Sequence, residues 1–245
     1  MSEPADRTAA LEAYHRDQVV DCTRCALSEG RTQVVVGNGD PASDVMFVGE
    51  APGYHEDRQG IPFVGASGKL LTTLLEGIGL RREDVFVANV LKCRPPGNRD
   101  PQPDEIAACR PHLYTQIRLI RPKVLCTLGN FATKLLSGRP DGITRVHGHP
   151  LEIEVEDVPV TLYPLFHPAA ALYARATLQT LEQDFARIPA LLRAAGAAPA
   201  SISAPPPAAA VVAPAPGGPA PAPAPPEPVV AAVADPGGAA QLGLF

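Results

Sequence analysis

The 245-residue sequence lacks any apolar run that approaches the ~20 residues a helix needs to span a bilayer. Its first residues, Met1 to Gln18, carry charges throughout and lack the apolar core of a signal peptide. Basic residues are outnumbered, 21 against 26 acidic ones, so the chain is not a polycation that coats nucleic acid through bulk charge. We therefore expect a soluble, cytoplasmic protein in which any contact with DNA depends on a local basic patch.

The sequence also lacks the glycine-rich loops that bind phosphate in nucleotide-binding proteins. A Walker A loop ending at Gly68-Lys69 requires glycine at position 63 and serine or threonine at position 70, where this chain has Phe63 and Leu70. No G-x-G-x-x-G follows a predicted strand, and no G-x-S-x-G elbow occurs. These absences argue against a phosphate-binding module.

Proline is abundant but unevenly spread. Of its 29 residues, 13 lie between Pro199 and Phe245, together with 15 alanines and 5 glycines. This composition has no hydrophobic period and too little side-chain bulk to offset the entropy of ordering. The sequence therefore predicts a globular domain over residues 1–198 and a disordered Pro/Ala-rich linker over 199–240.

Strands and helices are predicted to alternate along the globular part. We expect strands at 34–36, 45–48, 85–90, 124–128, 152–158 and 160–166, and helices over 5–20, 69–78, 104–120, 130–136 and most of 169–195, with a long polar loop at 49–65. This order indicates an α/β protein with three αβα layers and a central, mostly parallel sheet. Ligands bind such sheets at the carboxyl ends of strands, which directs attention to the loops after Val48, Val90 and Phe166.

Five cysteines in a chain without a secretion signal argue for metal binding or catalysis rather than for a disulfide framework. Cys22 and Cys25 form a C-x2-C pair, and Cys93 and Cys109 flank the start of a later predicted helix. Four thiolates from these positions fit either structural zinc or a [4Fe-4S] cluster. Cys126 lies inside an apolar strand and is expected to be a core residue.

The loops at the predicted strand ends hold the least generic residues of the sequence. Glu50 and Glu56 supply carboxylates, Phe63 is isolated in a Gly/Pro-rich segment, Asn89 ends a strand, and His167 precedes a proline. Phe63 could merely anchor its loop to the core, and a lone histidine usually connects a strand to a helix. Taken together, these residues could instead stack on a planar base whose edge is read by an amide.

Several separate motifs follow one another over about residues 10–195. They are C-x2-C near the start, G-E-A-P-G…E-D…G-x-P-F-V-G-x-x-G-x-L-L at 49–71, N-V-x-K-C-R-P-P-x-N-R at 89–99, Cys109, and H-P-A-A at 167–170. In this order they resemble the type-4, iron–sulfur uracil-DNA glycosylases of the uracil-DNA glycosylase superfamily.

The resemblance implies an enzyme of base excision repair, which flips uracil out of single- or double-stranded DNA and hydrolyses its N-glycosidic bond. It implies that Phe63 stacks on uracil, that Asn89 pairs with its edge, and that His167 faces the oxygen that gains charge. Glu50, Ala51 and Gly53 would line the pocket. Ala51 stands where the best-known branch of the superfamily has a water-activating aspartate, so the usual general base is missing. Glu50 and Glu56 are the carboxylates that remain to activate water. By its position, Glu56 is also the candidate for rejecting thymine.

The resemblance also implies a [4Fe-4S] cluster held by Cys22, Cys25, Cys93 and Cys109. Four cations close to the predicted pocket residues are candidate contacts to DNA phosphates: Lys92, Arg94, Arg99 and Arg175. A related kind of protein captures uracil-DNA without turnover and carries an added histidine in the loop where this chain has residues 94–99. The absence of histidine there favours the enzyme.

The last five residues, 241–245, differ from the bland linker before them. They read Gln-Leu-Gly-Leu-Phe and resemble the short peptide by which bacterial repair and replication proteins bind the β sliding clamp. In that interpretation Gln241 enters a polar subsite, and Leu242, Leu244 and Phe245 supply the apolar contacts. We thus expect a monomeric glycosylase that is tethered to the replication clamp.

Overall fold

The computed structural model describes residues 4–197. The predicted linker, 199–240, and the predicted clamp-binding peptide, 241–245, lie outside the described residues. No helix within the described part is both long and apolar enough to cross a membrane.

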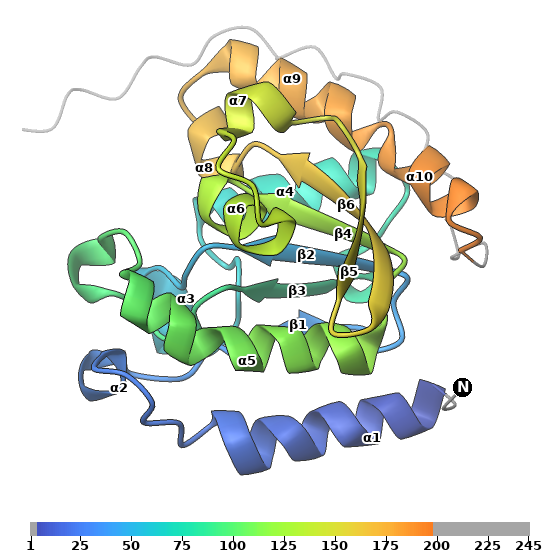
Figure 1. Cartoon of the computed structure of the whole chain (residues 1–245). Helices are drawn as coiled ribbons and strands as arrows, with labels where there is room; N and C mark the ends of the chain where they lie inside the picture. The colour runs from blue at the N-terminus through green and yellow to red at the C-terminus, as the bar shows by residue number, and fades with distance from the viewer. Residues whose placement is uncertain (1–3, 198–245) are drawn as a thin grey trace, which may run out of the picture. The chain divides into compact units, whose positions relative to one another are not determined.

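A six-stranded sheet forms the centre of the domain, in the order β1-β3-β2-β4-β6-β5 (Figure 1). The strands are β1 (Asn38–Gly39), β2 (Val45–Gly49), β3 (Phe86–Asn89), β4 (Val124–Leu128), β5 (Leu151–Val155) and β6 (Val158–Leu165). β3, β2, β4 and β6 are parallel, whereas β1 and β5 pair antiparallel at the two edges. The predicted α/β class with a mostly parallel sheet is confirmed.

Helices cover both faces of the sheet. One apolar cluster joins the sheet to α1 (Pro4–Tyr14), α5 (Pro103–Ile120) and α6 (Asn130–Ser137), and α1 lies against α5 (Figure 1). A second cluster joins the opposite face to α4 (Ala66–Gly77), α9 (Arg175–Phe185) and α10 (Ile188–Ala194). Because both faces are covered, β2 and β4 are buried along their whole length, as their continuous apolar sequences predict.

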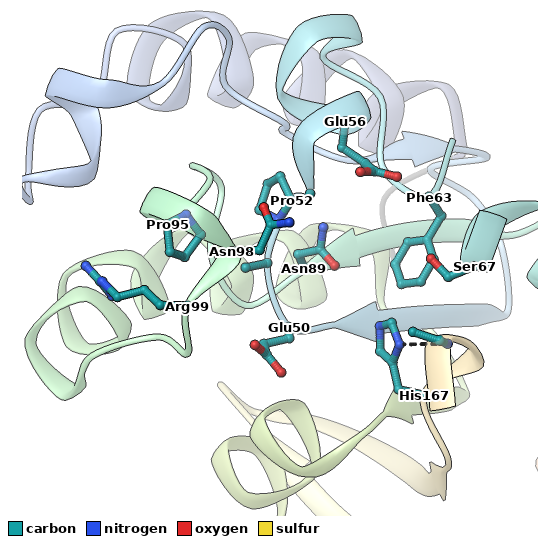
Figure 2. A pocket seen from close by; sticks show the side chains of 13 residues that line it. Glu50, Pro52, Glu56, Phe63, Ser67, Asn89, Pro95, Asn98, Arg99 and His167 are labelled. Atoms are coloured by element: carbon teal, nitrogen blue, oxygen red, sulfur yellow. Dashed lines mark hydrogen bonds between the residues drawn. The ribbon is translucent and has the colours of Figure 1, made fainter. Parts of the chain in front are cut away.

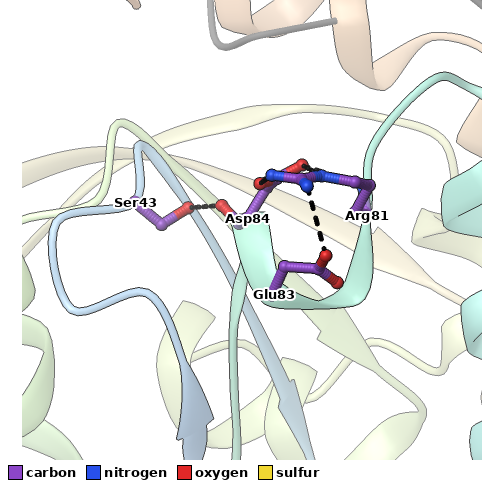
Figure 3. A network of polar contacts seen from close by, with 4 residues as sticks. All are labelled: Ser43, Arg81, Glu83 and Asp84. Atoms are coloured by element: carbon purple, nitrogen blue, oxygen red, sulfur yellow. Dashed lines mark hydrogen bonds and ion pairs between the residues drawn. The ribbon is translucent and has the colours of Figure 1, made fainter. Parts of the chain in front are cut away.

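The remaining elements are short. They are the π-helix η1 (His15–Val19), α2 (Leu27–Gly30), α3 (Tyr54–Gln59), the 3-10 turns η2 (Arg82–Asp84) and η3 (Pro96–Asn98), α7 (Ile143–Val146) and α8 (Pro168–Ala171). At η2, Arg81 pairs with Asp84, whose carbonyl accepts a hydrogen bond from the Ser43 hydroxyl at 2.8 Å (Figure 3). This contact joins the segments that lead into β2 and β3 and so fixes where the two parallel strands begin.

Three local expectations are wrong. Residues 34–36 form no strand, because the amide of Val35 and the carbonyl of Val36 bond to Lys92 and Gln116 instead of to a neighbouring strand. The expected polar loop at 49–65 contains α3, and the expected last helix is divided into α8, α9 and α10.

Candidate functional site

A pocket of about 380 Å³ opens where β2, β3 and β6 end. Strand order reverses beside β2, which has β3 on one side and β4 on the other, and such switch points are the usual ligand sites of parallel sheets. The pocket collects every residue that the sequence assigned to uracil or catalysis: Glu50, Ala51, Gly53, Glu56, Phe63, Asn89 and His167 (Figure 2).

Asn89, the last residue of β3, presents its amide to this pocket (Figure 2). The side chain is buried, yet its Oδ1 has no hydrogen-bond partner. Buried polar atoms are nearly always paired, so a lone acceptor in a pocket indicates a ligand that donates to it. Gly49 opposite must lack a side chain, because a Cβ there would lie 2.5 Å from Asn89 Oδ1 and 2.6 Å from the Phe63 ring.

The ring of Phe63 forms one wall of the pocket and is held there by its own loop. Its backbone has a φ of 57°, an unfavourable value for a bulky residue. The buried carboxylate of Glu56 stabilises the turn, since Oε1 accepts hydrogen bonds from the amides of Val64 and Gly65, both at 3.0 Å. Gly68 allows the first turn of α4 to approach, because a Cβ there would lie 1.8 Å from the Phe63 carbonyl oxygen.

His167 enters the pocket from the end of β6, with its ring centroid 5.7 Å from that of Phe63. Its Nδ1 accepts a hydrogen bond from the Ala169 amide at 3.1 Å (Figure 2). Burial lowers the pKa of His167 to about 4, although the Glu56 carboxylate acts in the opposite direction. The ring is therefore neutral near pH 7, and because Nδ1 is an acceptor, the proton is on Nε2, which can donate to a ligand.

Glu50 is the carboxylate nearest the end of β2. Its half-buried position raises its pKa, and the Asp100 carboxylate raises it further. Unlike Glu56, the Glu50 side chain has no hydrogen bond among the described residues, which leaves its oxygens free for water or ligand.

Four of the five cysteines gather around one cavity. Cys22, Cys25, Cys93 and Cys109 line one cavity, whereas Cys126 is buried in β4 as expected. Within residues 4–197, no three His, Cys, Asp or Glu side chains are spaced to hold a single metal ion. Burial raises the pKa of Cys93, and that of Cys109 to about 11, which argues against a nucleophilic thiol here.

Donors surround this group of cysteines. Arg31 Nη1 lies 3.5 Å from Cys93 Sγ, and the Lys92 amide donates to Cys109 Sγ at 3.3 Å. His112 Nε2 lies 3.2 Å from Cys22 Sγ, while its Nδ1 lies 2.9 Å from the Tyr14 hydroxyl. These polar contacts suit sulfur that carries negative charge.

The four expected phosphate contacts have different surroundings. Arg94 lies over the Tyr54 ring, 5.2 Å from its centroid, and Arg99 lines the pocket but is paired with Glu105 at 2.5 Å. Arg175 is exposed at the start of α9. The assignment of Lys92 is wrong, because this side chain is only 1 % exposed and its ammonium group is bonded inside the protein.

Sequence reasoning missed several residues of the pocket: Pro52, Ser67, Pro95, Asn98 and Ala169. Ser67 lies in the first turn of α4, between Gly65 and Gly68, and this glycine spacing is the signal that could have indicated it. The others lie within the quoted motifs at 49–71, 89–99 and 167–170, but their residue types alone did not mark them as pocket residues.

The pocket thus offers one aromatic face, one amide and one neutral imidazole donor in an α/β protein, groups that suit a flat ring with polar edges. Residues 36–190 match the family model described as the uracil DNA glycosylase superfamily. The chain therefore belongs to the uracil-DNA glycosylase superfamily, within its type-4 group.

The type-4 assignment depends on similar proteins from several organisms. The chain is 46% identical to the type-4 uracil-DNA glycosylase of Sulfurisphaera tokodaii over 178 residues, which is 71% of this chain and 81% of the relative. The type-4 enzyme of Archaeoglobus fulgidus is 45% identical over 175 residues, or 70% of this chain and 88% of the relative. That of Thermotoga maritima is 46% identical over 162 residues, or 65% and 82%.

Proposed function

We propose that the chain is a DNA-repair glycosylase that flips uracil out of DNA and hydrolyses its N-glycosidic bond, leaving an abasic site. The observation that carries this proposal is the unpartnered Oδ1 of Asn89, facing the same pocket as the Phe63 ring and His167. Family membership and the type-4 relatives support it.

Asn89 accounts for base selection. Its Oδ1 accepts from N3–H of uracil, and its Nδ2 donates to O4. Cytosine presents an unprotonated N3 and an amino group at these two places, so both halves of the buried amide would lose their partner. A site with unpaired buried polar groups rejects the wrong ligand strongly.

His167 and Phe63 account for bond cleavage. The uracil leaves as an anion, and catalysis requires donors that already point at the developing charge. The neutral His167 ring, fixed by the Ala169 amide, directs Nε2–H to the base oxygen. Phe63 contributes stacking, typically about 1–3 kcal/mol for a base on an aromatic ring. Glu50 is the carboxylate left to orient the attacking water.

The cysteines fit a [4Fe-4S] cluster, which would join the Cys22–Cys25 turn to the segments carrying Cys93 and Cys109. Four sulfurs line one cavity without the spacing for a single ion, and the donors Arg31 and Lys92 contact two of the four. When bound, such a cluster supplies strong iron–thiolate bonds between distant segments. Brown protein with a broad absorption near 400 nm supports this cofactor, and colourless protein with stoichiometric zinc contradicts it.

The partners and location are proposals as well. We infer that the protein acts as a monomer in the cytoplasm on single- and double-stranded uracil-DNA, with Arg94, Arg99 and Arg175 near the phosphates. We also infer that Gln241, Leu242, Leu244 and Phe245 bind the β sliding clamp.

One assay tests the central proposal. A labelled oligonucleotide with a single uracil is incubated with the protein and then treated with alkali, and an oligonucleotide with thymine at that position serves as control. Uracil-dependent strand cleavage supports turnover. A covalent, gel-shifted species would instead indicate capture without turnover, and intact DNA would contradict both.

A further inference from the structure

Lys92 is a buried cation that the proposed reaction does not use directly. Its side chain is 1 % exposed, and no carboxylate within residues 4–197 forms an ion pair with it. Burying an unpaired ammonium group costs several kcal/mol, so some other negative charge must compensate it. Lys92 lines the same cavity as the four cysteines, and its backbone amide donates to Cys109 Sγ at 3.3 Å.

The ammonium group also reaches the uracil pocket. Nζ donates to the backbone carbonyl of Asn89 at 2.8 Å and to Oε1 of Gln116 at 2.6 Å. Gln116 is held in turn by His15, at 2.7 Å between the two nitrogens, and by the Val36 carbonyl. One buried cation therefore lies between the four cysteines and the main chain of the residue that reads the base.

We propose that Lys92 is the counter-cation of the cysteine-bound cluster and that it positions Asn89 through the bond to its carbonyl. This inference depends on the proposed cluster and on the proposed reading of uracil by Asn89. Four thiolates around an iron–sulfur cluster leave the site negatively charged, and such charge is stabilised by a nearby cation. The same ammonium fixes the end of β3, because the Asn89 carbonyl accepts from it at the point where the strand ends.

The test compares Lys92→Met, Lys92→Arg and Lys134→Met in the full-length protein. Methionine keeps length and apolar volume but removes the charge, and arginine keeps the charge but changes the donor position. Lys134, exposed on α6, is the matched control. The readouts are iron content, the reduction potential of the cluster without DNA, affinity for uracil-DNA, and the single-turnover rate of uracil release.

We expect Lys92→Met to give a more negative reduction potential, because adding an electron becomes harder when the cation is lost. Its single-turnover rate should fall about 10- to 100-fold through misplacement of the Asn89 amide, with little change in DNA affinity. Lys92→Arg should retain the wild-type potential and still release uracil slowly. Lys134→Met should match wild type in every readout.

A wild-type potential in iron-loaded Lys92→Met would refute the counter-cation role, and an undiminished rate would refute the positioning role. Should the methionine variant fail to fold, Lys92→Arg decides: a wild-type potential with a slow rate supports the proposal, and any other combination contradicts it. Wild-type protein that releases uracil but contains no iron would overturn this inference and the cofactor proposal while leaving the glycosylase proposal intact.

Discussion

At the scale of single residues, the proposed recognition of uracil depends on polar atoms that the fold leaves without partners. Asn89 is buried with a free acceptor, and His167 has one nitrogen committed to the backbone and the other available. The Ala169 amide orients the His167 ring before any ligand binds, and the lack of a side chain at Gly49 leaves room for the Asn89 amide. Such preorganised donors and acceptors are what a reaction that releases an anion requires.

Replacing Asn89 with alanine should therefore reduce uracil release severely. Loss of one well-placed polar group in an active site typically costs about 10²- to 10³-fold in rate. The measurement is the single-turnover rate on a uracil oligonucleotide, and the visible absorption of the cluster serves as control for folding. A wild-type-like rate in Asn89→Ala would contradict the assignment of base recognition to this residue.

His167 should affect how stability depends on pH. Its pKa is about 4 in the folded protein against an ordinary value of 6.5, so between these values the unfolded chain binds a proton that the folded chain does not. Stability is then lost as pH falls from about 6.5 to 4. His167→Gln removes this titration, and urea unfolding at several pH values should show a shallower decline than in wild type.

His15 and His112 also have pKa values of about 4, so part of the decline should persist in that variant. Identical pH profiles for wild type and His167→Gln would show that the His167 ring is not buried in its neutral form. A control variant of exposed His149 should leave the profile unchanged.

The sequence predicted the residues of the pocket better than their roles. Asn89, Phe63 and His167 could be found because each is an unusual residue at a strand end or in a Gly/Pro-rich loop. Lys92 could not be placed, because lysine is normally exposed and its burial here results from contacts with Gln116, 24 positions away. Burial of a long cation depends on the tertiary packing around it, which no local pattern records.

At the scale of elements, the segment after β2 acts as one preformed unit. Helix α3 carries Glu56, and this buried carboxylate accepts the two amides that follow Phe63. The sequence did not predict α3, because six residues between two glycines are too few to show a helical period. Glu56 therefore looked like a catalytic or thymine-rejecting group, whereas its contacts are those of a positioning residue.

Two variants of Glu56 should separate these roles. Glu56→Gln keeps an oxygen that can accept from Val64 and Gly65, so we expect uracil release within about tenfold of wild type. Glu56→Ala removes both bonds, each worth about 1.5–3 kcal/mol when the acceptor is charged, and should lower both thermal stability and the rate of release. Equal and severe loss of activity in both variants would instead indicate that Glu56 acts on water.

At the scale of the whole molecule, the buried parallel strands at the centre of the sheet were more predictable than its edge strand β1 and the ends of elements. β2 and β4 are continuously apolar because both faces of the sheet are covered, and that pattern is visible in the sequence. β1 has only two residues, so no alternation could reveal it. Pro189 at the start of α10 was a signal that the predicted last helix is interrupted, since proline is favoured in a first helical turn.

In the whole chain, the domain and the last five residues, 241–245, should have separate functions: the domain releases uracil, and the terminal peptide binds the clamp. The predicted linker of about 40 residues would give the terminal peptide a reach of a few nanometres, enough to bind a clamp while the domain holds DNA.

Deleting 241–245, or replacing Leu244 and Phe245 with alanine, should abolish binding to purified β clamp. Uracil release from a short oligonucleotide should stay at the wild-type rate, because the pocket lies wholly within residues 4–197. Glu227→Ala in the linker is the matched control and should change neither readout. Clamp binding that survives the deletion would contradict the proposal that residues 241–245 bind the clamp.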